Sequence, residues 1–138
     1  MEQLLALRSL MERYDSFIVT EEMNYDEKLP VRAYFVRQVN REERGLLLKI
    51  VSVVACSVRI ALREWPDVVV CTGVLATIPI CLICKALGAK LIYIESFAKT
   101  NSPTISGKFL HRFADRFYVQ WKSMLSVYPD ARFVGGVY

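Results

Sequence analysis

The 138-residue chain carries 18 Lys and Arg against 14 Asp and Glu, a formal net charge of +4, and 54% of its residues are hydrophobic. This length suits one domain with a proper core, and the basic surplus is too small to indicate a nucleic-acid partner. No run of about 18 uncharged apolar residues occurs, so no spanning helix is predicted, and the apolar excess points to contact with a partner or a membrane surface.

In chain order, the first forty residues predict one helix and two short strands, with a polar loop between the strands. Leucines recur at helical spacing from Leu4 to Leu10, which places them on one face of a helix. The polar stretch after the first strand ends at Pro30, as is typical of a loop. The predicted bounds are 2–14 for the helix, 16–20 and 33–36 for the strands, and 21–30 for the loop.

Residues 42–64 show the longest helical pattern in the chain, and it is apolar on more than one face. Lys49, Arg59 and Arg63 interrupt this pattern. One interpretation is a helix buried between a sheet and its neighbours. The other is a helix that also touches lipid through one face, with its cations at the level of the headgroups. The pattern favours burial and leaves the lipid contact open.

From Pro66 onward, short apolar runs alternate with helical stretches. Continuous apolar strands separated by helices are typical of a parallel sheet that is covered on both faces. Crossovers of this length predict an α/β, Rossmann-like, doubly wound parallel sheet, and residues 1–138 form one domain because no linker interrupts them. The predicted strands are 68–71, 90–94, 116–119 and 132–134, and the predicted helices are one that ends at 87, 106–114 and 121–127.

The chain contains four cysteines, and two of them are spaced as in a zinc half-site or a redox pair. No second closely spaced Cys/His pair accompanies Cys81-x-x-Cys84, and the pair lies in an apolar helical stretch where cysteine is an ordinary small hydrophobic residue. We therefore predict no metal site, and reduced thiols in a cytosolic setting. The cysteines are Cys56, Cys71, Cys81 and Cys84.

In parallel sheets, ligands gather at the carboxyl ends of the strands, where helix N-termini also point. The first such end is Thr72-Gly73. Gly73 lets the chain turn tightly, and the next helix offers free N–H groups that suit an anion. Because a strand-to-helix turn needs such a glycine anyway, a structural role and a substrate-binding role stay equally open for these two residues.

The second strand end is Glu95-Ser96, and a hydroxyl-rich loop follows it. A carboxylate that closes a buried strand needs a hydrogen-bonding task, so Glu95 is the candidate catalytic base on a sugar hydroxyl, or else a group that binds hydroxyls without moving a proton. The loop ends in Gly-Lys at a predicted helix start, which suits a diphosphate, although Ser106 there also suits a plain N-cap. The candidate substrate-binding residues are Ser96, Thr104, Ser106, Gly107 and Lys108.

The third strand end is Gln120-Trp121. Both side chains are candidates to meet a sugar or a partner, and simple packing explains Trp121 equally well. The lone histidine, His111, is expected to be a solvated surface residue rather than a base. No Ser/His/Asp triad, metal cluster, carboxylate pair or GxGxxG can be assembled, so the residues predict a Rossmann-like domain with a polar site around Glu95 and no cofactor.

Several segments together resemble the PssD/CpsF type of capsule and exopolysaccharide proteins. They are 66–73, 88–96, 106–108 and 114–121, with 128–129 and the terminal 136–138. That group is similar to the membrane-anchoring subunit of the two-component UDP-GlcNAc transferase of N-glycan assembly. More distantly, the same stretch resembles the acceptor domain of MurG, the peptidoglycan GlcNAc transferase.

The resemblance implies the N-terminal, acceptor-side half of a GT-B glycosyltransferase, bound peripherally at the cytoplasmic face of the cell membrane. It would bind a polyprenyl-diphosphate-linked acceptor while a separate subunit supplies the nucleotide-sugar site, so the chain is not a complete enzyme alone. The implied reaction adds galactose, another hexose or GlcNAc from a UDP-sugar in capsule or exopolysaccharide synthesis. The C-terminal Gly136, Val137 and Tyr138 would dock against the partner. The alternative is a non-catalytic scaffold that recruits and stimulates a catalytic subunit.

One departure from the resemblance concerns the start of the chain. The family begins with a strand and a Gly-Gly-His loop before its first helix, whereas here residues 1–4 fall where that helix begins. Relative to the family pattern, the first strand and its loop are missing. Losing a central parallel strand is expected to expose apolar surface and weaken the fold.

Overall fold

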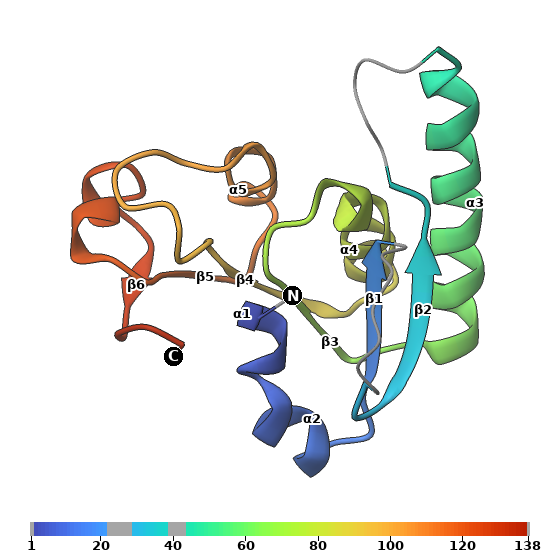
Figure 1. Ribbon diagram of the computed structural model, residues 1–138, viewed down its shortest axis with the longest axis horizontal. Coiled ribbons are helices and arrows are strands. Elements are labelled where there is room, and N and C mark those ends of the chain that lie inside the picture. The colour runs from blue at the N-terminus through green and yellow to red at the C-terminus, as the bar shows by residue number, and fades with distance from the viewer. Residues whose placement is uncertain (1, 22–28, 39–43, 138) are drawn as a thin grey trace.

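The computed structural model describes residues 2–21, 29–38 and 44–137, and its strands lie in two parallel sheets (Figure 1). In the first sheet, β1 (Phe17–Glu21) pairs with β2 (Arg32–Val36). The second sheet has the order β3-β4-β5-β6, with β3 (Val68–Cys71), β4 (Lys90–Ile94), β5 (Arg116–Val119) and β6 (Arg132–Phe133). Every strand pairing in these ranges is parallel. The prediction of a Rossmann-like α/β fold is confirmed.

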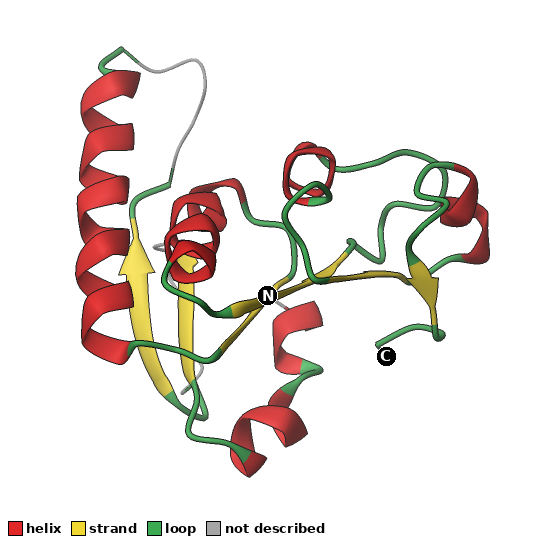
Figure 2. Ribbon diagram, turned by 180° about the vertical axis from the view of Figure 1, so that it is seen from behind, coloured by secondary structure: helices red, strands yellow, loops and turns green. Residues whose placement is uncertain are grey.

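Helices cover both faces of the sheets. The helices are α1 (Glu2–Leu5), α2 (Arg8–Arg13), α3 (Leu46–Glu64), α4 (Ile78–Ala86) and α5 (Ile105–Leu110), with 3₁₀ helices η1 (Leu75–Thr77) and η2 (Lys122–Ser126). Figures 1 and 2 show α4 and α5 on one side of the four-stranded sheet and α1 and α2 on the other. Within the described ranges, no helix combines the length and the apolar character that crossing a bilayer requires.

Two buried clusters form the core. The first cluster lies under β4, β5 and α5 and includes Tyr93, Leu110 and Phe117. The second cluster, around Ile60 and Ile80, joins α3 and α4, and side chains from β1, β2 and β3 all pack against it. The same layer of helices therefore holds both sheets together.

The inner edges of the two sheets, β1 and β3, have no further strand pairing among the described residues. Val68 at the start of β3 is half exposed, although it belongs to an apolar strand of the kind that is usually buried on both faces.

Four predicted helices differ from the structure. The long helix predicted at 42–64 begins at Leu46, after the left-handed Gly45. The helix predicted at 2–14 is two short helices, because the amide of Leu7 bonds to the carbonyl of Leu4 and closes a tighter turn there. The helix predicted at 106–114 ends at Leu110, since Asp115 must reach the backbone of Leu91 to start β5. The stretch 121–127 is the 3₁₀ helix η2. Most of the loop predicted at 21–30, and residues 42 and 43, lie outside the described ranges.

Candidate functional site

The carboxylate of Glu95, just past β4, is bonded entirely by groups of the protein. Its Oε1 accepts hydrogen bonds from the Ser96 amide at 2.9 Å and the Thr104 hydroxyl at 2.8 Å. Its Oε2 accepts from the Thr104 amide and the Tyr128 hydroxyl, both at 3.2 Å. The residue is 1% exposed. Through these hydrogen bonds, the carboxylate holds both the loop 96–104 and the segment after η2 against the end of β4.

Thr104 connects this carboxylate to α5. Its hydroxyl lies 3.0 Å from the Tyr93 hydroxyl and accepts a bond from the Gly107 amide at 2.9 Å. A hydroxyl has one proton, and that of Thr104 goes to Glu95, so the Tyr93 hydroxyl donates to Thr104. Thr104 is therefore the N-cap of α5. The N-cap interpretation of Ser106 was wrong, because Ser106 lies inside the helix and its hydroxyl donates instead to the Gly73 carbonyl at 3.2 Å.

Gly107 and Gly73 are required by close packing in this region. A Cβ at position 107 would lie 2.2 Å from Glu95 Oε2 and 2.8 Å from the Tyr128 hydroxyl. Gly73 has φ +101°, and a Cβ there would lie 3.0 Å from the Tyr93 hydroxyl. Both candidate anion-binding glycines thus have a structural explanation: they let α5 and the β3 turn approach the polar groups around Glu95.

The hydroxyls of Tyr93 and Tyr128 act as permanent donors to this network. Burial raises the pKa of both phenols, and the neighbouring charge of Glu95 raises each pKa further. Both phenols therefore stay protonated at neutral pH. With its oxygens filled by such donors and shielded from solvent, Glu95 has no free position from which to take a proton from a substrate. This geometry gives no support to Glu95 as a general base and favours a positioning role.

Two glutamine side chains, from the first helix and from the segment after β5, form hydrogen bonds to the backbone at the end of β4. Gln120, which is buried, donates to the Glu95 carbonyl at 2.8 Å and accepts from the Val137 amide at 2.9 Å. Gln3 donates to the same carbonyl at 3.2 Å and accepts from the Phe97 amide at 3.3 Å. Gln120 is thus used internally rather than offered to a sugar. Its bond to Val137 holds the C-terminal segment against the sheet.

Accessible side chains do occur at this edge. The Trp121 indole N–H donates to the Phe97 carbonyl at 2.6 Å, and the two rings lie 4.9 Å apart. Trp121 is 37% exposed and Phe97 38% exposed, so the pair offers aromatic surface to solvent. Thr72 and Ser96 are half-buried and Gly136 is exposed, while Tyr138 lies outside the described residues.

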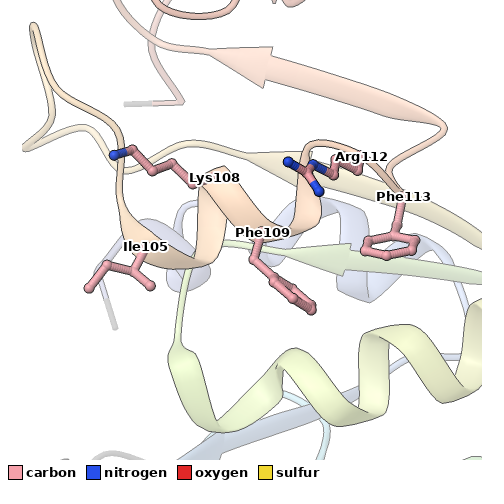
Figure 3. Close-up of a pocket in the computed structure, with 5 residues that line it drawn as sticks. All are labelled: Ile105, Lys108, Phe109, Arg112 and Phe113. Atoms are coloured by element: carbon pink, nitrogen blue, oxygen red, sulfur yellow. The ribbon is translucent and has the colours of Figure 1, made fainter.

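The last predicted site residue, Lys108, lines an open cavity of about 360 Å³ formed by side chains of α5 and the residues just after it. Figure 3 shows Phe109 and Phe113 projecting from one side of this segment, while Lys108 and Arg112 extend from its other edge. Sequence reasoning missed four of the five lining residues. The sequence does carry a signal for them, which is a spacing of four residues. Three apolar side chains recur at this spacing from Ile105, and two cations recur at it from Lys108, so each set lies along one face of a helix. The lining residues are Ile105, Lys108, Phe109, Arg112 and Phe113.

The cysteines of α4 pack as hydrophobic residues. Cys81 belongs to the first core cluster and Cys84 to the second. Burial raises the pKa of the Cys84 thiol. Within the part of the chain that the structure describes, no three His, Cys, Asp or Glu side chains gather as metal ligands. His111 is half-buried rather than solvated, with its ring 4.9 Å from those of Phe117 and Tyr128.

Parallel strands, crossover helices and a loop held over the carboxyl edge define a Rossmann-like α/β protein. Residues 9–137 match the sequence model described as "Oligosaccharide biosynthesis protein Alg14 like". The chain therefore belongs to the Alg14-like family of oligosaccharide biosynthesis proteins. The predicted similarity to the subunit of a two-component UDP-GlcNAc transferase is confirmed at the level of this family.

Curated relatives include subunits of that transferase. The chain is 43% identical over 75 residues to the UDP-N-acetylglucosamine transferase subunit alg14 of Schizosaccharomyces pombe, covering 51% of this chain and 36% of that protein. It is 35% identical over 81 residues to the human subunit ALG14, covering 54% and 38%. For the mouse subunit the identity is 34% over 84 residues, covering 56% and 39%. The matched stretches span less than half the length of these relatives.

Proposed function

We propose that the chain is the acceptor-side, non-catalytic subunit of a two-component transferase that adds a sugar from a UDP-sugar to a polyprenyl-diphosphate-linked acceptor at the cytoplasmic face of a membrane. The observation that carries this proposal is the internal saturation of Glu95, since the best candidate base is used to hold the loop and α5 in place. The names of the relatives as transferase subunits support it. A scaffold that completes and stimulates a catalytic subunit therefore fits better than a chain contributing the base.

The cavity on α5 is the best candidate contact for the acceptor. Lys108 and Arg112 supply two positive charges to a cavity that three apolar side chains also line. A polyprenyl diphosphate combines an anionic head with an apolar tail, so cations beside aromatic rings match both parts of it. In this proposal the acceptor's diphosphate lies near the two cations and its first isoprene units lie along the phenylalanines.

The partner would complete a GT-B enzyme by bringing the nucleotide-sugar site to the carboxyl edge. The C-terminal segment is well placed to receive it, because Gln120 fixes the Val137 amide while Val134 is 74% exposed. The Phe97 and Trp121 rings add a second apolar contact near the end of β4. Ordered apolar groups of this kind are effective anchors at protein interfaces.

The donor proposed is UDP-GlcNAc, because the curated relatives are named for it. The second candidate is transfer of galactose or another hexose in capsule or exopolysaccharide synthesis, which the segment resemblance from residue 66 onward favours. The acceptor chemistry, a sugar on a polyprenyl diphosphate, is the same for both. The choice of donor is therefore what an assay must decide.

The test is a transfer assay with this chain, a co-expressed nucleotide-sugar-binding subunit from the same source, and a short polyprenyl-diphosphate-GlcNAc acceptor. We expect transfer from UDP-GlcNAc only when both chains are present. Transfer from UDP-galactose by the pair would support the second candidate. Transfer by the purified chain alone, at the rate of the pair, would refute the two-component proposal.

A further inference from the structure

The side chain of Gln3 binds a pair of backbone groups at the carboxyl end of β4. Its amide nitrogen donates to the Glu95 carbonyl at 3.2 Å, and its amide oxygen accepts from the Phe97 amide at 3.3 Å. One side-chain amide thus satisfies a backbone acceptor and a backbone donor that lie two residues apart. Ligands bind at this edge of a parallel sheet, and backbone N–H and C=O groups are among the polar groups that orient them.

The two hydrogen bonds of Gln3 are long, since N–H···O bonds are most often about 2.9–3.0 Å in length. Gln120 donates to the same Glu95 carbonyl at 2.8 Å, and a carbonyl oxygen has two lone pairs. The Glu95 carbonyl therefore stays bonded when Gln3 leaves. The bond from the Phe97 amide to Gln3 is exposed, so that water or a ligand can replace Gln3 there. Exchange of Gln3 for another polar group thus costs little.

The helix that carries Gln3 is loosely packed. Neither α1 nor α2 contains a buried residue. At four residues, α1 is far shorter than a helix that is stable by itself in water. Gln120, by contrast, is buried, and the Val137 amide also holds its side chain. Gln3 is therefore the exchangeable partner of this strand end and Gln120 the fixed one.

Aromatic surface borders the same two backbone groups. Phe97 supplies both the amide and a ring, and the Trp121 indole N–H donates to the Phe97 carbonyl, which holds the indole beside that ring. Both rings are more than a third exposed. A donor and an acceptor beside exposed aromatic rings suit a sugar, because its polar groups bond at the rim while its C–H face packs on a ring.

We propose that the Glu95 carbonyl and the Phe97 amide form a subsite for the N-acetylhexosamine of the acceptor, and that Gln3 competes with the sugar for it. In N-acetylglucosamine the amide N–H on C2 and the hydroxyl oxygen on C3 are neighbours, so the N–H donates to Glu95 while the oxygen accepts from Phe97. The Gln3 amide presents the same donor and acceptor side by side. This inference rests on the proposed function for its substrate, and the sugar would lie beside the rings that meet the partner.

The test is an NMR titration of the whole ¹⁵N-labelled chain with methyl N-acetyl-β-glucosaminide. We expect the signals of the Phe97 amide and the Trp121 indole to move. Gln3→Ala should bind this glycoside at least about threefold more tightly, because two hydrogen bonds no longer compete with it. Trp121→Ala should bind it at least about fivefold more weakly, since the aromatic face is lost. Gln38→Ala, at an exposed glutamine after β2, is the matched control and should bind like the parent.

The 3-deoxy analogue of the glycoside tests the same pair without any variant. It lacks the oxygen that accepts from Phe97, so we expect binding at least about threefold weaker and no movement of the Phe97 amide signal. Equal binding of the two glycosides would overturn the subsite. Unchanged or weaker binding of the glycoside by Gln3→Ala would also overturn it and make Gln3 a structural tie. Tighter binding of the partner subunit alone by Gln3→Ala would overturn it too, and would assign the pair to a peptide.

The transfer assay separates this inference from the proposed function. With the partner subunit, Gln3→Ala should lower the KM for the polyprenyl-diphosphate-GlcNAc acceptor by about the factor seen for the glycoside. The KM for the UDP-sugar should stay at the parental value. Transfer with an unchanged acceptor KM in Gln3→Ala would overturn the subsite and leave the proposed function standing. Tighter glycoside binding by Gln3→Ala, without transfer by the pair of chains, would refute the proposed function and leave the subsite standing.

Discussion

Gly107 lies directly against the carboxylate of Glu95, so that a Cβ at residue 107 would come within 2.2 Å of Glu95 Oε2. Contacts this short do not occur, so α5 can rest on the end of β4 only because residue 107 has no side chain. The close approach also lets the Gly107 amide bond to Thr104, whose hydroxyl in turn bonds to Glu95. These residues therefore form one packed unit that positions the loop and the helix together.

Replacing Gly107 by Ala tests this packing. We expect Gly107→Ala to lower the free energy of unfolding by about 2 kcal/mol, because the added methyl group forces α5 away from the strand end. Urea denaturation followed by circular dichroism measures the change. The matched control is Lys108→Ala, one residue later at an exposed position of α5, which should stay within about 0.5 kcal/mol of the parent. Equal stability of the two variants would contradict the packing.

Glu95→Gln separates a positioning role from a catalytic one. The amide keeps the shape of the side chain but presents a donor where the carboxylate accepted, which leaves buried groups of Thr104 or Tyr128 without a partner. We expect a loss of about 3 kcal/mol in unfolding free energy. Turnover per folded molecule, measured with the partner subunit below the variant's melting temperature, should stay near the parental value. Normal stability with abolished turnover would instead identify Glu95 as a catalytic residue.

Removing the cations of the α5 cavity tests the proposed acceptor contact. In Lys108→Gln, Arg112→Gln we expect the KM for the polyprenyl-diphosphate acceptor to rise at least about tenfold, since two charge-assisted contacts to phosphate are lost. The KM for the UDP-sugar and the melting temperature should not change. Lys122→Gln, at an exposed cation on η2, is the control. An unchanged acceptor KM would remove the cavity from the proposed site.

Asp115 makes stability depend on pH at the acidic end. Its Oδ2 accepts from Lys85 Nζ at 2.9 Å and from the Leu91 amide at 2.8 Å, and these bonds hold the pKa of the carboxyl below its usual value. Below the unfolded pKa of about 4, the unfolded chain binds the proton more readily than the folded one. The stabilisation from Asp115 is therefore complete above that pH and is lost as the pH falls through the lower, folded pKa.

Urea midpoints measured between pH 3 and pH 7 check this linkage, with the window set by the ordinary aspartate pKa of about 4. The parent chain should lose more stability on acidification than Asp115→Asn, which should already be less stable at neutral pH. Asp130→Asn, at an exposed position, should follow the parent. Parallel pH curves for the parent and Asp115→Asn would show that the ion pair contributes nothing.

The sequence by itself determined the strands of the second half of the fold. The bounds predicted for β3, β4 and β5 agree with the structure, because each is a continuous apolar run closed by polar or small residues. The long helix was predicted too, but it begins at Leu46 rather than at residue 42, since Gly45 before it is left-handed. Local patterns suffice to predict such elements, because a buried strand or a helix can be recognised from the spacing of apolar residues that are close together in sequence.

The roles of the polar residues were decided only by the tertiary structure. Glu95 was expected to bond to a substrate, as a base or as a group that binds hydroxyls, yet its acceptor positions are filled by Thr104, nine residues on, and by Tyr128, 33 residues on. Gly107 looked like part of an anion-binding loop, yet it provides the space that α5 needs beside that carboxylate. A sequence shows which groups are able to bond but not which partners reach them, since hydrogen bonds between distant segments depend on how helices and strands pack.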